Sequence, residues 1–285
     1  MHTQKAFSAG ALWSRLAQLR LGWRAAIKVA LFALVLVAVL YPHPIFLAKQ
    51  IGNLRNLEGL IQPDLPEMAQ INQEIDKSLP DDCSPRQEYK AVERYVYQRI
   101  KYQYDWYNWG NLDYWPTAQE VWQRQKEDCD GRAVMAVSIL RSRGFETAKL
   151  VGNLNHIWVA VDNEELMGPQ EDKNFKREGG KTKLSLPSRK TLLDSLAMVS
   201  KFPVVRSLVI FFAALVLCYH PGNRWGRFFG LSTIGLAGFL LLLDWANLHL
   251  ANEVAGVNFN CVAGLSLIGA SLVAACVAGH SRRPQ

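Results

Sequence analysis

Residues 126–133 read Lys-Glu-Asp-Cys-Asp-Gly-Arg-Ala and mark the point where a polar stretch gives way to an apolar helical pattern. Asp128 is a natural N-cap residue, and small and aliphatic residues recur at helical spacing from Ala133 to Leu140. Gly144 follows where a helix is commonly closed by a left-handed residue. The pattern predicts a helix with Cys129 in its first turn.

A thiol in the first turn of a helix lies in a distinctive electrostatic environment. The unpaired N–H groups and the positive end of the helix dipole stabilise a thiolate at Cys129 and an oxyanion formed beside it. The flanking acids Asp128 and Asp130 have the opposite effect, because their charges raise the thiol pKa. That effect is avoided if they point away, bind a cation, or pair with Lys126 or Arg132.

A histidine follows 27 residues later, in the strand-like stretch Asn155–Val161. A thiol at a helix start with an imidazole on a nearby strand is typical of nucleophilic cysteine enzymes, where the imidazole removes the thiol proton. The pair Cys129 and His156 is therefore the predicted catalytic pair. The alternative is structural, since lone cysteines are usually small buried residues and strand histidines are often satisfied core residues.

These residues together resemble a known family. The motifs that carry the resemblance are Trp115-Pro116, Trp122, Asp128–Ala133, Leu140–Phe145 and His156–Val159. They are similar to the transglutaminase-like superfamily, which has a papain-like fold, and most similar to its bacterial transglutaminase-like cysteine proteases. The resemblance covers roughly residues 90 to 172. It implies an α+β fold in which the helix bearing Cys129 packs on an antiparallel sheet.

The family implies a Cys-His-Asp triad with the acid on the strand that pairs with the histidine strand. Here Asp162-Asn163 predicts a hairpin turn, and Gly168-Pro169 stands where the family usually has Asp-Pro. The expected orienting acid is therefore missing at residue 168.

Other residues are candidates for the third member of the triad. If the strands pair across the hairpin turn, about residues 169–171 lie opposite His156, and the polar residues within reach are Gln170, Glu171 and Asp172. The predicted third member is Asp172, with Gln170 and Glu171 as alternatives. Asp162 is a poor substitute, since six residues of strand span about 20 Å.

The predicted reaction is nucleophilic acyl chemistry. His156 takes the thiol proton, the thiolate attacks an acyl carbon, and water hydrolyses the thioester, which describes a peptidase or amidase. Two alternatives remain: an acyl transferase that crosslinks through a lysine amine, and a non-catalytic binding domain on a membrane anchor, which the missing acid at Gly168 favours. In the resembling proteases, acids beside the cysteine help to bind calcium. Asp128 and Asp130 match that placement, although two acids are too few ligands and also fit an N-cap and a first-turn acid.

The 285-residue chain, 49% hydrophobic, is strongly segregated, with apolar runs on both sides of one polar block. Such runs predict membrane helices with the transglutaminase-like domain inserted between them. The expected organisation is a basic amphipathic leader (1–24), a first transmembrane helix (25–48), a linker or short helical lead-in (49–85) with its helix around residues 67–79, the transglutaminase-like domain (86–200), three further transmembrane helices (203–219, 226–244 and 254–279) and a tail (280–285).

Lysine and arginine placement predicts the orientation. The first 28 residues contain Lys5, Arg15, Arg20, Arg24 and Lys28 and no acid, so the N-terminus is expected in the cytoplasm. Alternation of four spans places the polar block in the periplasm or outside the cell and the C-terminus in the cytoplasm. The net charge of +7 is then a topology signal, and nucleic-acid binding is not required. The expected partners are the bilayer and a protein or peptide substrate at its surface.

Five cysteines occur, and only Cys83 and Cys129 fall in the polar block. In an oxidising compartment they could form a disulfide, which would inactivate Cys129. No Cys/His spacing suits zinc. The aromatic stretch from Tyr102 to Trp115 is expected either to line a peptide-binding groove or to pack over the core.

Overall fold

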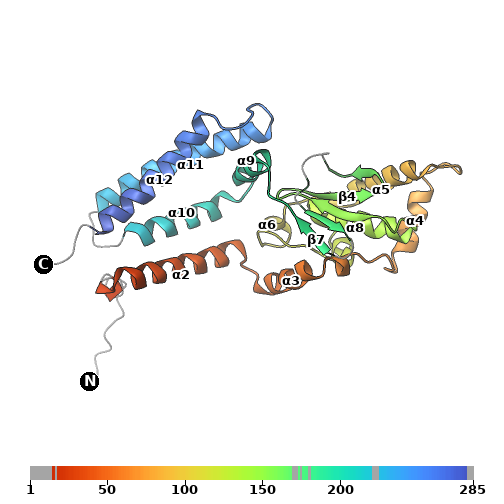
Figure 1. Cartoon of the computed structure of the whole chain (residues 1–285), viewed down its shortest axis with the longest axis horizontal. Helices are drawn as coiled ribbons and strands as arrows, with labels where there is room; N and C mark the ends of the chain where they lie inside the picture. The colour runs from red at the N-terminus through yellow and green to blue at the C-terminus, as the bar shows by residue number, and fades with distance from the viewer. Residues whose placement is uncertain are drawn as a thin grey trace, which may run out of the picture. The chain divides into compact units, whose positions relative to one another are not determined.

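The computed structural model describes residues 15, 16, 18–168, 173, 175–178, 181–219 and 225–280. The chain divides into two compact units. We call Tyr41–Ser195 the mixed unit, because it combines helices with small sheets, and Met1–Leu40 with Leu196–Gln285 the helical unit (Figure 1).

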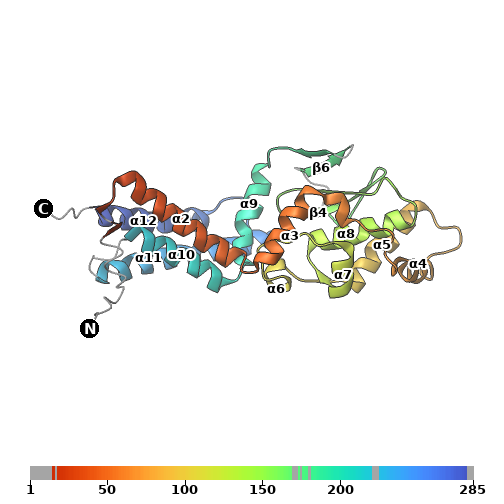
Figure 2. The same ribbon diagram turned by 90° about the horizontal axis from the view of Figure 1, so that it is seen from below.

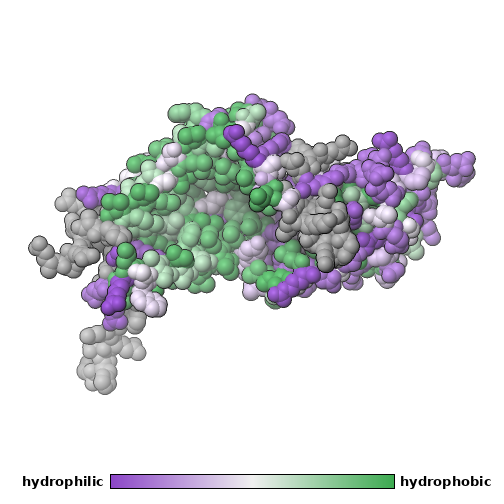
Figure 3. Space-filling model, viewed as in Figure 1, coloured by the Kyte–Doolittle hydropathy of each residue, from purple (hydrophilic) through white to green (hydrophobic). Residues whose placement is uncertain are grey.

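The helical unit carries the apolar helices. These are α2 (Leu21–Leu40), α10 (Val204–Tyr219), α11 (Trp225–Leu250) and α12 (Phe259–His280). In the described part of the chain, three spans are long and apolar enough to cross a bilayer, and there are four if the bent pair 189–200 and 204–218 is one broken span. On the face in Figure 3 these helices present a largely hydrophobic surface, whereas hydrophilic residues dominate the mixed unit. The chain is therefore a membrane protein.

The first span differs from the expected residues 25–48. Helix α2 ends at Leu40, residues 41–43 are not helical, and a separate helix, α3 (Pro44–Arg55), begins at Pro44. Pro42 and Pro44 explain the break, because proline removes a backbone donor and its ring clashes with the preceding turn. Helix α11 extends to Leu250, beyond the expected limit of residue 244.

Helices α11 and α12 form a close antiparallel hairpin, and α2 lies alongside α10 in both views (Figure 2). Gly238 and Gly264 permit the close approach of α11 to α12. A Cβ at Gly238 would lie 2.7 Å from the Gly264 carbonyl oxygen, and a Cβ at Gly264 would lie 2.7 Å from that of Gly238. Small residues at such crossings let helix backbones pack within a membrane.

The mixed unit is built on a five-stranded antiparallel sheet of order β5-β4-β3-β6-β7. Its strands are β3 (Lys149–Gly152), β4 (Ile157–Val161), β5 (Glu164–Leu166), β6 (Phe175–Glu178) and β7 (Lys181–Leu184). Strands β4 and β5 pair with Val159 opposite Leu166, and the chain reverses at Asp162, whose φ is +49°. The hairpin predicted at Asp162-Asn163 is confirmed.

Helix α8 (Cys129–Ser142) is the central helix of the mixed unit and packs on β3 and β4 (Figure 1). Its start at Cys129 and the left-handed Gly144 after its end agree with the sequence pattern. Every residue from Ala133 to Leu140 is buried, so the helix is enclosed on all sides rather than along one apolar face. Helices α4 (Met68–Asp76), α5 (Pro85–Arg99) and α7 (Ala118–Arg124) complete this enclosure.

Of the two expectations for residues 49–85, the linker is wrong, because most of this segment belongs to the mixed unit's core, whereas the lead-in helix expected around residues 67–79 is present as α4. It contributes the end of α3, the 3-10 helix η1 (Leu57–Leu60) and α4, and Leu57, Leu60, Ile71 and Ile75 are all buried. The prolines of this segment lie between short helices rather than in an extended connection. The remaining elements are β1 (Lys101–Tyr102), α6 (Asp105–Asn108), β2 (Lys126–Glu127), α9 (Arg189–Ala197) and η2 (Met198–Ser200).

Candidate active site around Cys129

Cys129 is the first residue of α8, and Asp128 is its N-cap. The Asp130 N–H donates to Asp128 Oδ1 at 3.3 Å, as an N-cap contact requires. Strand β2 leads into the helix and pairs with β1, which fixes the direction of entry. The backbone N–H of Ile157 lies close enough to Cys129 to lower the pKa of its thiol, so the cysteine helix, which packs on β4, meets the histidine strand one residue from His156.

Burial raises the pKa of the Cys129 thiol, and the negative charge of Asp128 raises it further. The Ile157 N–H acts in the opposite direction but does not cancel these effects. Arg132 interacts electrostatically with Asp128, but its hydrogen bonds go elsewhere. Arg132 donates to the Ile100 carbonyl at 2.5 and 3.1 Å, while Lys126 is exposed. The resting group is therefore a thiol.

His156 is held in one orientation by its surroundings. Its Nε2 lies 2.7 Å from the Met167 carbonyl oxygen, and its backbone N–H donates to Asn153 Oδ1 at 3.0 Å. The ring stacks on Trp158 with centroids 5.8 Å apart and planes 20° apart. Because a carbonyl only accepts, Nε2 carries the hydrogen and the neutral ring has its lone pair on Nδ1. Both residues are described, and no direct hydrogen bond joins Cys129 to His156.

At residue 168 there is no space for an acidic side chain that could orient His156. A Cβ on Gly168 would lie 2.5 Å from Trp158 Cγ and 2.6 Å from its Cβ, so no side chain fits while Trp158 keeps this position. The Met167 carbonyl instead accepts from the histidine nitrogen that an acid would orient. A backbone group therefore holds the tautomer of His156.

The proposed third members Asp172, Gln170 and Glu171 lie outside the described residues. Asp162, which the strand geometry disfavoured, is engaged elsewhere. It accepts from the Tyr89 hydroxyl at 2.6 Å, and this hydrogen bond is the largest contribution to raising the pKa of Tyr89 to about 12. Asp162 therefore ties the hairpin to α5.

A cluster of carboxylates lies beside the cysteine. Its members are Asp105, Glu127, Asp128 and Asp130, and one oxygen of each lies within 4.8 Å of the other three. Asp105, Glu127 and Asp130 are buried. Four acids thus gather where the sequence pattern identified only Asp128 and Asp130.

Protein N–H groups fix one oxygen of each buried acid. Asp105 Oδ2 accepts from the Tyr114 N–H at 2.6 Å, and Glu127 Oε1 accepts from the Trp109 indole at 2.7 Å. Asp130 Oδ1 accepts from the N–H of the following residue at 2.7 Å. Glu127 Oε2 accepts from the Asp128 N–H at 3.3 Å. Among the described residues, Asp105 Oδ1 and Asp130 Oδ2 are buried without a donor, and a hydrogen bond with Asp128 contributes to raising the pKa of Asp130. Such groups are costly unless something binds them.

The cluster has strongly perturbed pKa values. Burial, followed by repulsion from Asp128, raises the pKa of Glu127 to about 9. Burial and Asp128 likewise raise the pKa of neighbouring Asp113 to about 6 and hold those of Asp105 and Asp130 well above their usual range. These carboxyls resist ionisation together because like charges in a dry site repel.

Sequence reasoning missed Asp105 and Glu127. Parallel pairing of β1 with β2 sets Tyr102 opposite Glu127 and so brings the two segments together. The sequence does show Glu127 directly before Asp128 and acids interspersed in the aromatic stretch. Neither feature indicates that these acids meet in the folded protein.

Part of the aromatic stretch packs over the core, which was one of its two expected roles. Trp109 and Tyr114 are buried and pack against Phe46, as core residues do. Tyr102 and Tyr104 lie near the cysteine, since a charged Cys129 contributes to raising the pKa of both after their own burial.

Cys83 and Cys129 are free thiols, so the disulfide alternative is not realised in this structure. Comparison with protein-family models, curated proteins and solved structures finds no match to this chain.

Proposed function

We propose that the chain is a membrane-anchored cysteine hydrolase, acting on an amide in a protein or peptide, with Cys129 as nucleophile and His156 as base. The proximity of the Ile157 N–H to Cys129 carries the proposal, because it sets the histidine strand against the start of the cysteine helix. A helix bearing a cysteine, packed on an antiparallel sheet bearing a histidine, supports a transglutaminase-like, papain-like arrangement.

The mechanism follows from the hydrogen bond that orients the imidazole. Nε2–H is held by Met167, so Nδ1 accepts the Cys129 proton as the sulfur attacks the acyl carbon. The protonated imidazole then donates to the leaving amine, and water attacks the thioester with His156 again as base. The N–H groups of Asp130 and Gly131 are occupied by carboxylates, so we assign the Cys129 N–H to the oxyanion.

The carboxylate cluster is proposed as a calcium site. Calcium–oxygen distances are about 2.3–2.6 Å, so two oxygens on one ion lie at most about 5 Å apart, and the 4.8 Å limit of this cluster satisfies that requirement. The unpartnered oxygens of Asp105 and Asp130 are the observation that supports a ligand. Bound there, the ion would neutralise the buried negative charge beside Cys129, and the carboxylates would hold it.

Membrane placement extends the proposal. The Lys and Arg distribution supports four spans with both termini in the cytoplasm, so the mixed unit faces the periplasm or cell exterior. Its substrate would then be an envelope protein or peptide near the bilayer.

One observation favours a second candidate, a non-catalytic binding domain. Trp158 fills the space of an acid at residue 168, and the pKa of Cys129 is raised rather than lowered. In that case the mixed unit would bind an envelope protein without acyl chemistry.

The test is covalent acetylation of Cys129 by p-nitrophenyl acetate in the full-length protein, read by mass spectrometry with Cys83 as internal reference. Catalysis predicts acetylation of Cys129 that is lost in His156→Ala and retained in His43→Gln. General-base assistance contributes on the order of 10²-fold or more, so the loss should be of that size. Acetylation equal in the wild type and His156→Ala would exclude the hydrolase and leave the binding domain.

Calcium binding has its own test, since Trp109 contacts Glu127 at 2.7 Å and can sensitise a bound lanthanide. Terbium luminescence excited through tryptophan should appear in the wild type and decline on adding calcium. Asp105→Asn with Asp130→Asn should abolish it, whereas Asp194→Asn, outside the cluster, should not. Unchanged luminescence in the double variant would refute the site.

A further inference from the structure

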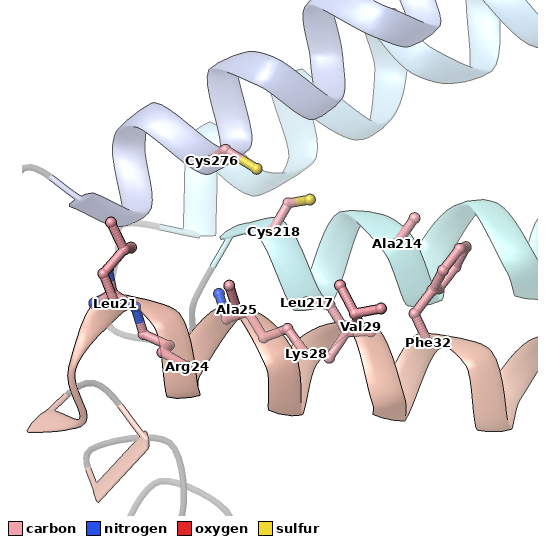
Figure 4. A pocket seen from close by; sticks show the side chains of 10 residues that line it. All are labelled: Leu21, Arg24, Ala25, Lys28, Val29, Phe32, Ala214, Leu217, Cys218 and Cys276. Atoms are coloured by element: carbon pink, nitrogen blue, oxygen red, sulfur yellow. The ribbon is translucent and has the colours of Figure 1, made fainter.

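A second concentration of charge lies in the helical unit. A cavity of about 380 Å³ opens between α2, α10 and α12. Among the described residues, the charged ones that line it are Arg24 and Lys28, both on α2, while aliphatic, aromatic and thiol side chains form the rest of the wall. Figure 4 shows Cys218 and Cys276 on the helices across from them.

The cavity brings together three ends of the bundle. It is lined by the first half of α2, the last turns of α10 and the last turns of α12. Alternation of the spans places these three ends on one side of the bilayer. Lys28 is seven residues into α2, about 10 Å along an axis of about 30 Å. The two cations therefore lie close to one membrane interface, with apolar wall extending inward.

We propose that this cavity binds an anionic phospholipid, with the phosphate on Arg24 and Lys28 and part of an acyl chain against the apolar wall. The charges are complementary, and a guanidinium with an ammonium one turn away suits phosphate oxygens. Basic pockets between membrane helices on the cytoplasmic side are a recurrent headgroup site. The inference requires membrane insertion but not the chemistry of Cys129.

The cavity's own cysteines provide the probe. The full-length protein is delipidated in detergent and placed in nanodiscs of phosphatidylcholine, with or without phosphatidylglycerol. Maleimide labelling of Cys218 and Cys276 is followed by mass spectrometry, with Cys83 in the mixed unit as reference. We expect phosphatidylglycerol to slow labelling of the two cavity cysteines about tenfold relative to phosphatidylcholine alone, in line with two contacting cations. Labelling of Cys83 should not change.

Two variants separate headgroup recognition from general packing. Arg24→Gln with Lys28→Gln should remove the preference for phosphatidylglycerol. Arg206→Gln, near the opposite end of α10, should retain it. Ala25→Trp keeps both charges but fills the cavity, and it should also lose lipid-dependent protection, so the conclusion does not depend on one variant folding correctly.

Three outcomes would overturn the proposal. The first is equal protection by the two lipid compositions. The second is protection by phosphatidylglycerol that persists in both the charge variant and the filled variant. The third is equal protection by inorganic phosphate alone, which would identify a site for the free anion rather than for a lipid.

Discussion

The two units concentrate charge of opposite sign, and they do so by different means. In the mixed unit, carboxylates from several elements converge, and backbone or indole N–H groups hold one oxygen of each buried member. In the helical unit, Arg24 and Lys28 come from one helix at i, i+4 spacing, with apolar wall around them. Fixed oxygens within a few ångströms suit a small ion of defined coordination, whereas long cationic side chains suit a pliable headgroup.

The largest effect expected from this comparison is on pH-dependent stability. The folded pKa of Glu127 is about 9 and its usual value is 4.5, so the folded state binds the proton more tightly. Without calcium, stability is highest at low pH and falls as pH rises through this window. Between about pH 5.5 and pH 8 we expect a loss on the order of 2–3 kcal/mol. Hydrogen exchange of α8 amides in chelator would measure it, and a rise over this range would contradict it.

Calcium should reverse much of that loss. At a concentration about 100-fold above its dissociation constant, an ion that binds only the folded state adds about 2.7 kcal/mol. The same α8 exchange measurement at about pH 8 should show this gain in the wild type and in Arg24→Gln with Lys28→Gln. It should be absent in Asp105→Asn with Asp130→Asn, and a gain that survives there would place the ion elsewhere.

Gly168→Ala probes the histidine side of the site. The added Cβ would contact Trp158 at 2.5 Å, so the indole or the backbone must shift, at a cost of about 1–3 kcal/mol. The matched control is Gly226→Ala in α11, where nothing lies within 4 Å of the new Cβ. Chemical denaturation of the full chain in detergent compares them. Equal stability of the two variants would mean that Trp158 shifts at little cost in free energy.

The smallest effect tests whether the two charged sites are independent. Arg24→Gln with Lys28→Gln should leave α8 hydrogen exchange unchanged to within about 0.5 kcal/mol, as for distant sites with no shared partners. A larger change would show that the helical unit is energetically coupled to the cysteine site.

Local features were predictable from the sequence. Helix α8, strand β4 and the hairpin at Asp162 follow from a cap, a short apolar run and a turn pair, which are signals within a few residues. The apolar runs likewise predicted membrane helices, although their limits moved where Pro42 and Pro44 broke the first span.

The meeting of distant residues in the site was not predictable from the sequence. Asp105 and Glu127 meet because two short strands pair in parallel, and neither strand has a clear sequence pattern. The core role of residues 57–75 was hidden by the prolines around it. The acceptor on His156 is a main-chain oxygen, so no side chain at residue 167 signals it in the sequence.

That main-chain acceptor has a consequence for genetics. If Cys129 and His156 act as proposed, a scan of side-chain substitutions would not detect this acceptor, because a substitution of Met167 leaves its main-chain oxygen in place. The residue at 167 is nevertheless restricted, because Met167 is buried and its φ is +65°, a backbone conformation that proline and β-branched residues do not readily adopt. A carbonyl also does not ionise, so the orientation of His156 requires no acidic group to be deprotonated and should persist at low pH, where a protonated ring still donates from Nε2.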